Sequence, residues 1–234
     1  YTAVDKAEGE PGAAHALNAE GARVLAESAA KHGAVIIHIS TDYVFDGLKT
    51  APYVEDDPTS PMSVYGRSKL AGEDAVRRAN PRHVIVRTSW VHSATGSNFT
   101  KTMLRLGAER PELKVVDDQT GAPTYAPHLA AALLDMAREV AGTPKPEHFG
   151  TFHATGSGAT TWCGFAREIF RVAATHGAIT PVLKPITTAE YPTPARRPAN
   201  SQLDCSKLAR VYGLTLPEWR TGVADCVARL TTKP

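Results

Sequence analysis

The sequence predicts an α/β protein with a Rossmann-like, doubly wound parallel sheet, and two observations favour this fold class. Short apolar runs rich in β-branched residues, such as Ala34 to Ser40 and His83 to Ser89, alternate with stretches of helical periodicity. The connections between most of these runs are short. Because parallel strands need crossover helices that cover both faces of the sheet, this alternation indicates a parallel sheet.

The first half of the chain is the more regular. Ala, Leu and Val at helical spacing predict a helix from Ala13 to Lys31, followed by the strand Ala34 to Ser40. The segment from Asp46 to Ser63 is dense in Gly, Pro, Asp and Ser, which predicts a long exposed loop. A further helix is expected from about Val64 to Ala79, and it leads into the strand His83 to Ser89.

The second half repeats the pattern more loosely. Helices are expected near Asn98 to Ala108 and His128 to Val140, on either side of a strand at Leu113 to Asp117. A strand at Gly150 to Ala154 precedes a helix at Thr161 to Thr175. We therefore expect residues 1–110 to form the remainder of a dinucleotide-binding and catalytic domain. Residues 111–234 are expected to form mostly a smaller, partly irregular substrate-binding lobe, with segments that return to the main sheet.

Composition limits the kinds of partner. The 26 Lys and Arg residues nearly balance the 24 Asp and Glu residues, so the net charge of +2 gives no electrostatic case for nucleic acid or an anionic membrane. The three cysteines form no CxxC pair and are interpreted as reduced thiols of a cytoplasmic protein. No apolar run approaches the ~20 residues that span a bilayer. The nine histidines lack HxH or HExxH spacing, so no metal site is predicted from them.

Tyr65 and Lys69 are the first candidates for chemistry. They lie four residues apart, which on a helix puts both side chains on one face. A tyrosine has a reference pKa of ~10, and a nearby ammonium that favours phenolate would make it useful for general acid/base catalysis. This spacing also occurs by chance on many helices, so its context decides its meaning.

Two strand ends supply that context. Thr41 and Asp42 follow the strand Ala34 to Ser40, and ligands of open α/β sheets bind outside the carboxyl ends of strands. Their alternative role is to end a strand and begin a turn. Trp90 follows the next strand, where its indole could stack on a flat ring or simply pack under a loop.

Longer motifs around these residues resemble the dTDP-4-dehydrorhamnose reductase family of extended short-chain dehydrogenases/reductases. The likeness runs from Tyr1 through the C-terminal helix. The motifs that carry it are STDYVFDG at residues 40–47, VYGRSKLAGE at 64–73, RTSWV at 87–91, VDDQTGAPTY at 116–125 and RPANS at 197–201.

The resemblance implies reduction of the C4 keto group of dTDP-4-dehydro-L-rhamnose by NADPH or NADH. The product, dTDP-L-rhamnose, serves cell-wall or lipopolysaccharide biosynthesis. The implied catalytic residues are Thr41, Tyr65 and Lys69. Tyr65 would donate a proton to the carbonyl oxygen, Thr41 would hydrogen-bond the developing oxyanion, and Lys69 would bias Tyr65 and hold the nicotinamide ribose.

The resemblance also implies binding residues. Thr41 and Asp42 match positions that contact the sugar, Trp90 matches the aromatic residue near the nucleotide portion, and Asn98 is a further substrate candidate. The implied cofactor neighbours are Tyr1, Thr2, Ile39, Tyr65 and Lys69. A homodimer with a magnesium site of glutamates at its interface is known among the relatives, and both are implied here only by likeness.

One departure from the family is the lack of a glycine-rich turn near the start of the chain. Gly9, Gly12 and Gly21 do not follow a strand, although a strand, turn and helix N-terminus should receive the cofactor pyrophosphate. Since each βαβ unit needs ~30 residues, on the order of 60 residues are expected ahead of Tyr1. The sequence is therefore interpreted as a fragment whose isolated sheet would expose an apolar edge.

Other functions stay open at this point. A non-catalytic regulatory subunit would resemble the β subunit of methionine adenosyltransferase, but the presence of Thr41, Tyr65, Lys69 and Trp90 together favours catalysis. A nucleotide-sugar epimerase or dehydratase would share the Tyr65/Lys69 spacing and the strand-end hydroxyl. Arg196 and Arg197 could bind a diphosphate or form an exposed basic turn.

Overall fold

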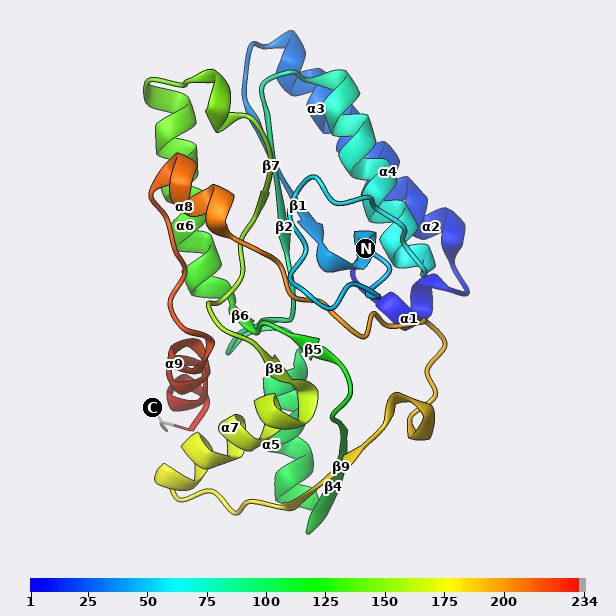
Figure 1. The fold of residues 1–234 in the computed structure, drawn as a ribbon, viewed down its shortest axis with the longest axis vertical. Helices are drawn as coiled ribbons and strands as arrows, with labels where there is room; N and C mark the ends of the chain where they lie inside the picture. The colour runs from blue at the N-terminus through cyan, green and yellow to red at the C-terminus, as the bar shows by residue number, and fades with distance from the viewer. Residues whose placement is uncertain (232–234) are drawn as a thin grey trace. The chain divides into compact units, whose positions relative to one another are not determined.

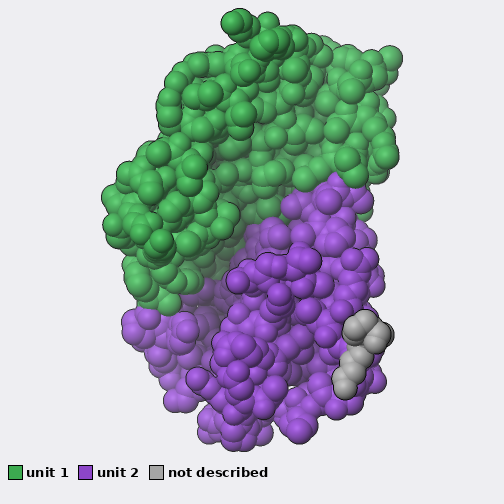
Figure 2. Space-filling view, turned by 180° about the vertical axis from the view of Figure 1, so that it is seen from behind, with its two compact units in different colours: residues 1–88, 132–154, 193–215 green, residues 89–131, 155–192, 216–234 purple. Residues whose placement is uncertain are grey.

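The computed structural model describes residues 1–231 and has an α/β architecture (Figure 1), as the sequence predicts. Contacts divide the chain into two compact units (Figure 2). Unit 1 contains residues 1–88, 132–154 and 193–215, and unit 2 contains residues 89–131, 155–192 and 216–231. The expected division near residue 110 separates a cofactor-binding domain from a substrate-binding lobe by their functions. The two units are defined by contacts, so that division stays a prediction.

Unit 1 is built on a parallel sheet. Its strand order is β1 (Ile36–Thr41), β2 (His83–Thr88) and β7 (Gly150–His153). The register pairs Ile37 with Val84 and Ile85 with Thr151. The predicted strands Ala34 to Ser40 and His83 to Ser89 are therefore confirmed, with ends that differ by one or two residues.

Helices cover both faces of this sheet (Figure 1). On one face, α4 (Val64–Ala79) and α3 (Gly21–Lys31) bury Ala26, Val76 and Ile85. On the other face, α8 (Ser206–Tyr212) packs on β7. The remaining elements with residues in unit 1 are α1 (Val4–Ala7), α2 (Pro11–His15), η1 (Ala16–Glu20), η2 (Asp42–Val44), η3 (Pro146–His148) and the C-terminal part of α6 (Ala126–Gly142).

The helix predicted from Ala13 to Lys31 is interrupted. A π-helical turn, η1, separates α2 from α3 and contains Asn18, which is only 6% exposed. The Asn18 Nδ2 donates to Ser68 Oγ of α4 at 2.9 Å and to the Tyr1 carbonyl at 3.0 Å. Such turns often occur at functional sites, and this one fixes the side of α4 that carries Ser68.

Unit 2 is a helical group with small pairs of strands. Helices α5 (Phe99–Glu109), α7 (Trp162–Thr175) and α9 (Trp219–Thr231) surround a core that includes Phe165, Ile169 and Val223. Three strand pairs complete it: β3 (Val91–His92) with β6 (Thr124–Tyr125), β4 (Glu112–Val116) with β9 (Val182–Ile186), and β5 (Thr120–Gly121) with β8 (Thr160–Thr161). A short helix, η4 (Thr188–Glu190), follows β9.

The loop between β1 and α4 also agrees with the sequence. Beyond η2 it contains no regular element up to Val64, apart from an isolated bridge between Tyr53 and Leu203. The three cysteines are free thiols. Across the described residues, no helix combines the length and apolar character that crossing a membrane requires.

Because η1 packs closely on α4, one methyl group added at Gly72 should strongly destabilise the fold. A Cβ added at Gly72 would lie 2.1 Å from the Asn18 carbonyl oxygen, so Gly72→Ala must move backbone. We expect a loss of about 1–3 kcal/mol in the free energy of unfolding, measured by urea denaturation. Gly142→Ala in α6 is the control, because nothing lies within 4 Å of its added Cβ. A Gly72 variant as stable as this control would contradict the close packing of η1 on α4.

Candidate active site

The first turn of α4 places Tyr65 beside the end of β1. Ser63 caps this helix by accepting from Gly66 N–H at 3.1 Å, and Glu8 Oε1 accepts from Val64 N–H at 2.8 Å. The Tyr65 ring meets the Tyr43 ring edge to face, with centroids 5.6 Å apart. Two separate segments of the chain therefore hold the helix start against the turn that follows β1.

Thr41 links Tyr65 to Asp42. Its hydroxyl donates to Asp42 Oδ1 at 3.0 Å, accepts from Tyr43 N–H at 3.2 Å, and lies within hydrogen-bonding reach of the Tyr65 phenol. Thr41 and Tyr65, predicted from separate motifs, are thus brought together. Thr41 also begins the turn that follows β1. It therefore ends the strand and also lies beside a candidate catalytic group, and these are the two roles that the sequence left open.

The Tyr65 phenol is held in its protonated form. Burial and the nearby Asp42 raise its pKa to about 12, although the Thr41 hydroxyl acts in the opposite direction. The expected lowering of this pKa by Lys69 is not seen, because burial dominates and Lys69 makes its hydrogen bond elsewhere. A protonated phenol at neutral pH is the form that a proton donor requires.

Lys69 lies one turn after Tyr65 on α4. Its Nζ donates to the Ile39 carbonyl of β1 at 2.6 Å. Burial lowers its pKa, while the carboxylate of Glu73 raises it. Ile39 itself is 37% exposed although it sits within a strand. The expected contacts of Lys69 and Ile39 with a nicotinamide cofactor stay predictions.

Tyr1 is anchored in unit 1. Its hydroxyl donates to Glu10 Oε2 at 2.6 Å, and its ring packs in a small cluster that includes Val64 and Tyr65. Thr2, the other cofactor neighbour expected at this end, is exposed. The surroundings of Tyr1 are consistent with the expected cofactor contact, which stays a prediction.

Asp42 is almost completely buried. It is 3% exposed, and its Oδ2 makes no hydrogen bond and is shielded from solvent. Burial raises the pKa of this carboxyl to about 6, against hydrogen bonds from Ser201, Thr41 and backbone N–H groups that lower it. The expected contact between Asp42 and the sugar would need this oxygen to become accessible.

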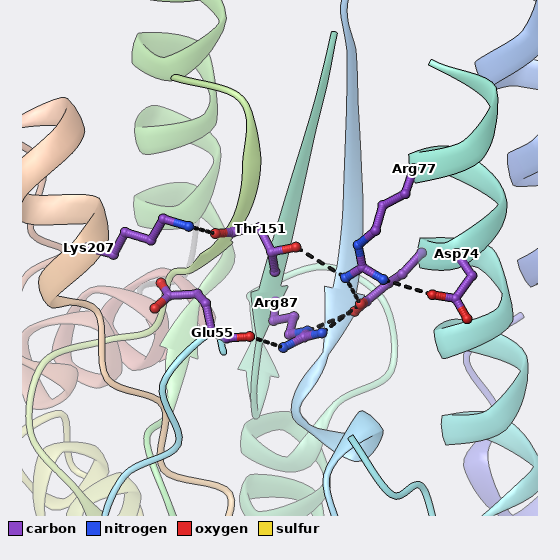
Figure 3. A network of polar contacts seen from close by, with 7 residues as sticks. Glu55, Asp74, Arg77, Arg87, Thr151 and Lys207 are labelled. Carbon is purple, nitrogen blue, oxygen red and sulfur yellow. Dashed lines mark hydrogen bonds and ion pairs between the residues drawn. The ribbon is translucent and has the colours of Figure 1, made fainter. Parts of the chain in front are cut away.

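A buried ion pair fixes α4 further along the side that carries Tyr65 and Lys69 (Figure 3). Arg87 of β2 donates to both carboxylate oxygens of Glu73, at 2.9 and 2.7 Å, and the two side chains are 2% and 0% exposed. Arg77 adds a contact to Glu73 at 2.7 Å, and Arg87 also donates to the Glu55 carbonyl at 3.3 Å. The sequence motifs do not predict this pair. A charged residue inside the otherwise apolar strand His83 to Thr88 was the available signal, because a buried charge needs a partner.

Trp90, in unit 2, is stacked on another tryptophan. The ring centroids of Trp90 and Trp162 are 3.7 Å apart and their planes are nearly parallel. Gly121 approaches the same indole so closely that an added Cβ would lie 2.5 Å from Trp90 Cε2. The Trp90 backbone has a φ of 48°, a strained value for a non-glycine residue. Nothing in the sequence pattern pointed to Trp162, since its contact with Trp90 depends on tertiary packing.

Asn98 has a structural role in unit 2. It is the N-cap of α5, where its Oδ1 accepts from Lys101 N–H at 3.2 Å. Its Nδ2 donates to the Ser93 carbonyl at 2.7 Å. These bonds engage both ends of the amide, and the expected contact with substrate stays a prediction.

Arg197 is engaged by Asp5. The guanidinium donates to both Asp5 carboxylate oxygens, at 3.1 and 2.8 Å, and this pairing holds the pKa of Asp5 below its usual value. The pair joins α1 to the C-terminal segment of unit 1. The sequence left open an exposed basic turn at Arg196 and Arg197. In the structure, the ion pair with Asp5 attaches Arg197 to the rest of unit 1.

No group of three or more His, Cys, Asp or Glu side chains within residues 1–231 is arranged to hold a metal ion. The magnesium site implied by the resemblance therefore gains no support.

A parallel sheet, a strand-end threonine and a helix carrying Tyr65 and Lys69 are the features expected of an extended short-chain dehydrogenase/reductase, the class that the resemblance implies. Residues 1–232 match the family model described as RmlD substrate binding domain. The dTDP-4-dehydrorhamnose reductase of Sinorhizobium fredii is 52% identical over 94% of this chain and 74% of its own length. That of Escherichia coli K12 is 45% identical over 99% of this chain and 78% of its own length. The chain belongs to the dTDP-4-dehydrorhamnose reductase family.

Solved structures agree with this membership. The dTDP-4-dehydrorhamnose reductase of Clostridium acetobutylicum superposes with a TM-score of 0.92 at 41% identity, over 99% of this chain and 79% of that one. The enzyme of Bacillus anthracis, solved in complex with NADP, superposes with a TM-score of 0.89 at 37% identity, over 98% and 78%. The predicted Rossmann-like fold is thereby confirmed.

Removing the charge of Glu73 tests the ion pair. Glu73→Gln should leave the Arg87 cation buried beside a neutral amide and lower the free energy of unfolding by about 3–5 kcal/mol. Glu109→Gln is the matched control, because its Arg105 pair is exposed and should contribute less than about 1 kcal/mol. Equal stability of the two variants in urea denaturation would rule out a structural role for the buried pair.

Proposed function

We propose that this chain reduces the C4 keto group of dTDP-4-dehydro-L-rhamnose to give dTDP-L-rhamnose. The observation that carries the proposal is the group of Thr41, Tyr65 and Lys69 at the end of β1. The phenol is protonated at neutral pH, a hydroxyl lies beside it, and an ammonium lies one turn away on the same helix. Family membership supplies the substrate class.

The chemistry follows from the position of these groups. The nicotinamide cofactor supplies the hydride when it is bound. As negative charge develops on the keto oxygen, the Tyr65 phenol donates a proton to it. Thr41 hydrogen-bonds the same oxygen, which lowers the energy of the charged transition state.

NADPH or NADH would be held by residues of unit 1. Lys69 would donate to the nicotinamide ribose once it leaves the Ile39 carbonyl, and the exposed Ile39 side chain would offer an apolar contact for the ring. Tyr1 and Thr2 are further candidates near the cofactor. The NADP complex of the Bacillus anthracis enzyme supports a cofactor of this kind.

Four residues are proposed to contact the substrate. Thr41 and Asp42 are assigned to the sugar, and Trp90 and Asn98 to the rest of the dTDP-sugar. The Trp90 indole is pre-oriented by Trp162, which would reduce the entropy lost when a nucleotide ring stacks on it. A homodimer remains a prediction from the resemblance, and a cytoplasmic location remains a prediction from the cysteines.

A regulatory subunit without catalysis is the alternative of another class. It has no chemical need for a buried phenol next to a hydroxyl and an ammonium, so the geometry favours the reductase. NADPH consumption in the presence of dTDP-4-dehydro-L-rhamnose tests the proposal directly. Tight NADPH binding without turnover would instead support the regulatory role.

Loss of the Tyr65 hydroxyl should stop the reaction. Tyr65→Phe is expected to lower kcat by about 10²–10⁴-fold, because it removes the proton donor and leaves the ring packing intact. The Kd for NADPH, measured by fluorescence titration, should stay within about twofold, since the substitution removes no charge that could hold the cofactor. Tyr191→Phe, at an exposed position, is the control. A Tyr65→Phe enzyme with the activity of this control would exclude the acid role.

Trp90 should act on binding more than on chemistry. Trp90→Ala is expected to raise KM by about tenfold or more with a smaller change in kcat, because a stacking contact stabilises bound substrate and transition state alike. Trp90→Phe should retain part of the affinity. An unchanged KM in the alanine variant would count against stacking.

A further inference from the structure

Asp42 is a buried acid to which the proposed chemistry assigns no proton. Its Oδ1 accepts from the Thr41 hydroxyl, its Oδ2 has no partner, and its side chain is shielded from solvent. A carboxylate with one unsatisfied oxygen in such a place is costly, and protonation relieves the cost. The carboxyl can therefore change its charge under conditions in which the enzyme is folded.

The charge on Asp42 decides which way the Thr41 hydroxyl points. An ionised carboxylate only accepts hydrogen bonds, so Thr41 must donate to it, as it does in this structure. The Tyr65 phenol can then only donate toward Thr41, which draws its proton away from a substrate. A neutral Asp42 can donate to Thr41 instead, so the Thr41 hydroxyl is free to donate to the Tyr65 oxygen in the free enzyme and to the keto oxygen once substrate is bound. The phenolic proton is then available to the keto group.

On the basis of the reductase function proposed above, we propose that Asp42 is a positioning residue that acts through Thr41. In its neutral form it turns the Thr41 hydroxyl toward Tyr65 and returns a proton to that residue after each reduction. This role through Thr41 is additional to the sugar contact proposed above.

The proton transfer balances without any further reactant. After Tyr65 has given its proton to the substrate, the Thr41 Oγ1–H bond breaks and its proton passes to the phenolate oxygen. The Asp42 carboxyl O–H bond breaks at the same time, and its proton passes to Thr41 Oγ1. One proton has then moved from the carboxyl to the phenolate, and solvent restores it before the next turnover.

The neighbours of Asp42 allow this titration to be observed. Tyr43 lies on the same turn, Tyr65 faces Asp42 from α4, and Ser201 from the C-terminal segment of unit 1. The Arg197 and Asp5 ion pair lies next to Tyr43 and lowers the Asp5 pKa, so Asp5 is ionised well below the range in which Asp42 titrates. Burial raises the Tyr43 pKa far above that range.

The first test needs no turnover. In protein labelled with ¹³Cζ-tyrosine, the Tyr65 signal is assigned by its absence from Tyr65→Phe. We expect its chemical shift to change with an inflection near pH 6, as the hydrogen bond from Thr41 reverses. The inflection should be lost in Asp42→Asn and kept in Asp56→Asn, a control at an exposed position of the β1–α4 loop. A wild-type Tyr65 signal without an inflection between pH 5 and 7 would overturn the proposal, whether or not the variants fold.

The second test is kinetic. The wild-type kcat for the keto sugar should fall as pH rises through about 6, because the neutral form of Asp42 is lost. Asp42→Asn should lower kcat by about tenfold or more and flatten this pH profile, whereas loss of a sugar contact alone would raise KM and leave the pH profile of kcat unchanged. An amide can still hold the Thr41 hydroxyl but cannot release a proton to it.

A double-mutant cycle separates a relay from two independent effects. In a Thr41→Val background, which lacks the bridging hydroxyl, Asp42→Asn should change kcat little further. Additive losses, or an Asp42→Asn enzyme with the wild-type kcat and pH profile, would refute the role of Asp42 and leave the reductase function standing. Absence of turnover in the wild type would refute the reductase function, and the ¹³Cζ titration would still decide the link between Asp42 and Tyr65.

Discussion

The buried ion pair between Arg87 and Glu73 is the constraint on which the catalytic helix depends. Both charges lie in a region where an unpaired ion would be strongly unfavourable, so the two side chains can only be accommodated together. Because Arg87 belongs to β2 and Glu73 to α4, this requirement sets the rotation and height of the helix on the sheet. The Arg87 bond to the Glu55 carbonyl extends the same constraint to the loop before α4.

The position of the reacting groups follows from that rotation. Tyr65, Lys69 and Glu73 lie at successive intervals of four residues, so they share one side of α4. When Glu73 is fixed against β2, Lys69 meets the Ile39 carbonyl and Tyr65 meets the end of β1. Asn18 holds the helix from the opposite segment through Ser68. The Tyr65/Lys69 motif thus has its geometry only because residues outside the motif orient the helix.

Local patterns explain which features the sequence predicts well. The helix from Val64 to Ala79 was predicted with its observed bounds, since its hydrophobic spacing and the breaker residues around it are local signals. The parallel sheet and the meeting of Thr41 with Tyr65 follow from the rule that strand ends share one edge. The π-turn at Asn18 and the stack of Trp162 on Trp90 depend on contacts between distant segments, and no local pattern encodes them. For the Glu73 pair, the charge of Arg87 within a strand indicates that a partner is needed but does not identify it.

Two features of the candidate site are unfavourable in themselves. The Trp90 backbone has a positive φ, and the Asp42 carboxyl is buried with an unsatisfied oxygen. A folded pKa of about 6 against 3.8 means that the Asp42 carboxyl contributes roughly 3 kcal/mol to the free energy of unfolding below pH 4, and that this contribution is lost as pH rises through 6. An asparagine or serine would avoid that loss. A residue whose ionisation weakens the fold near neutral pH is better explained by the proton that it can exchange with Thr41 than by packing.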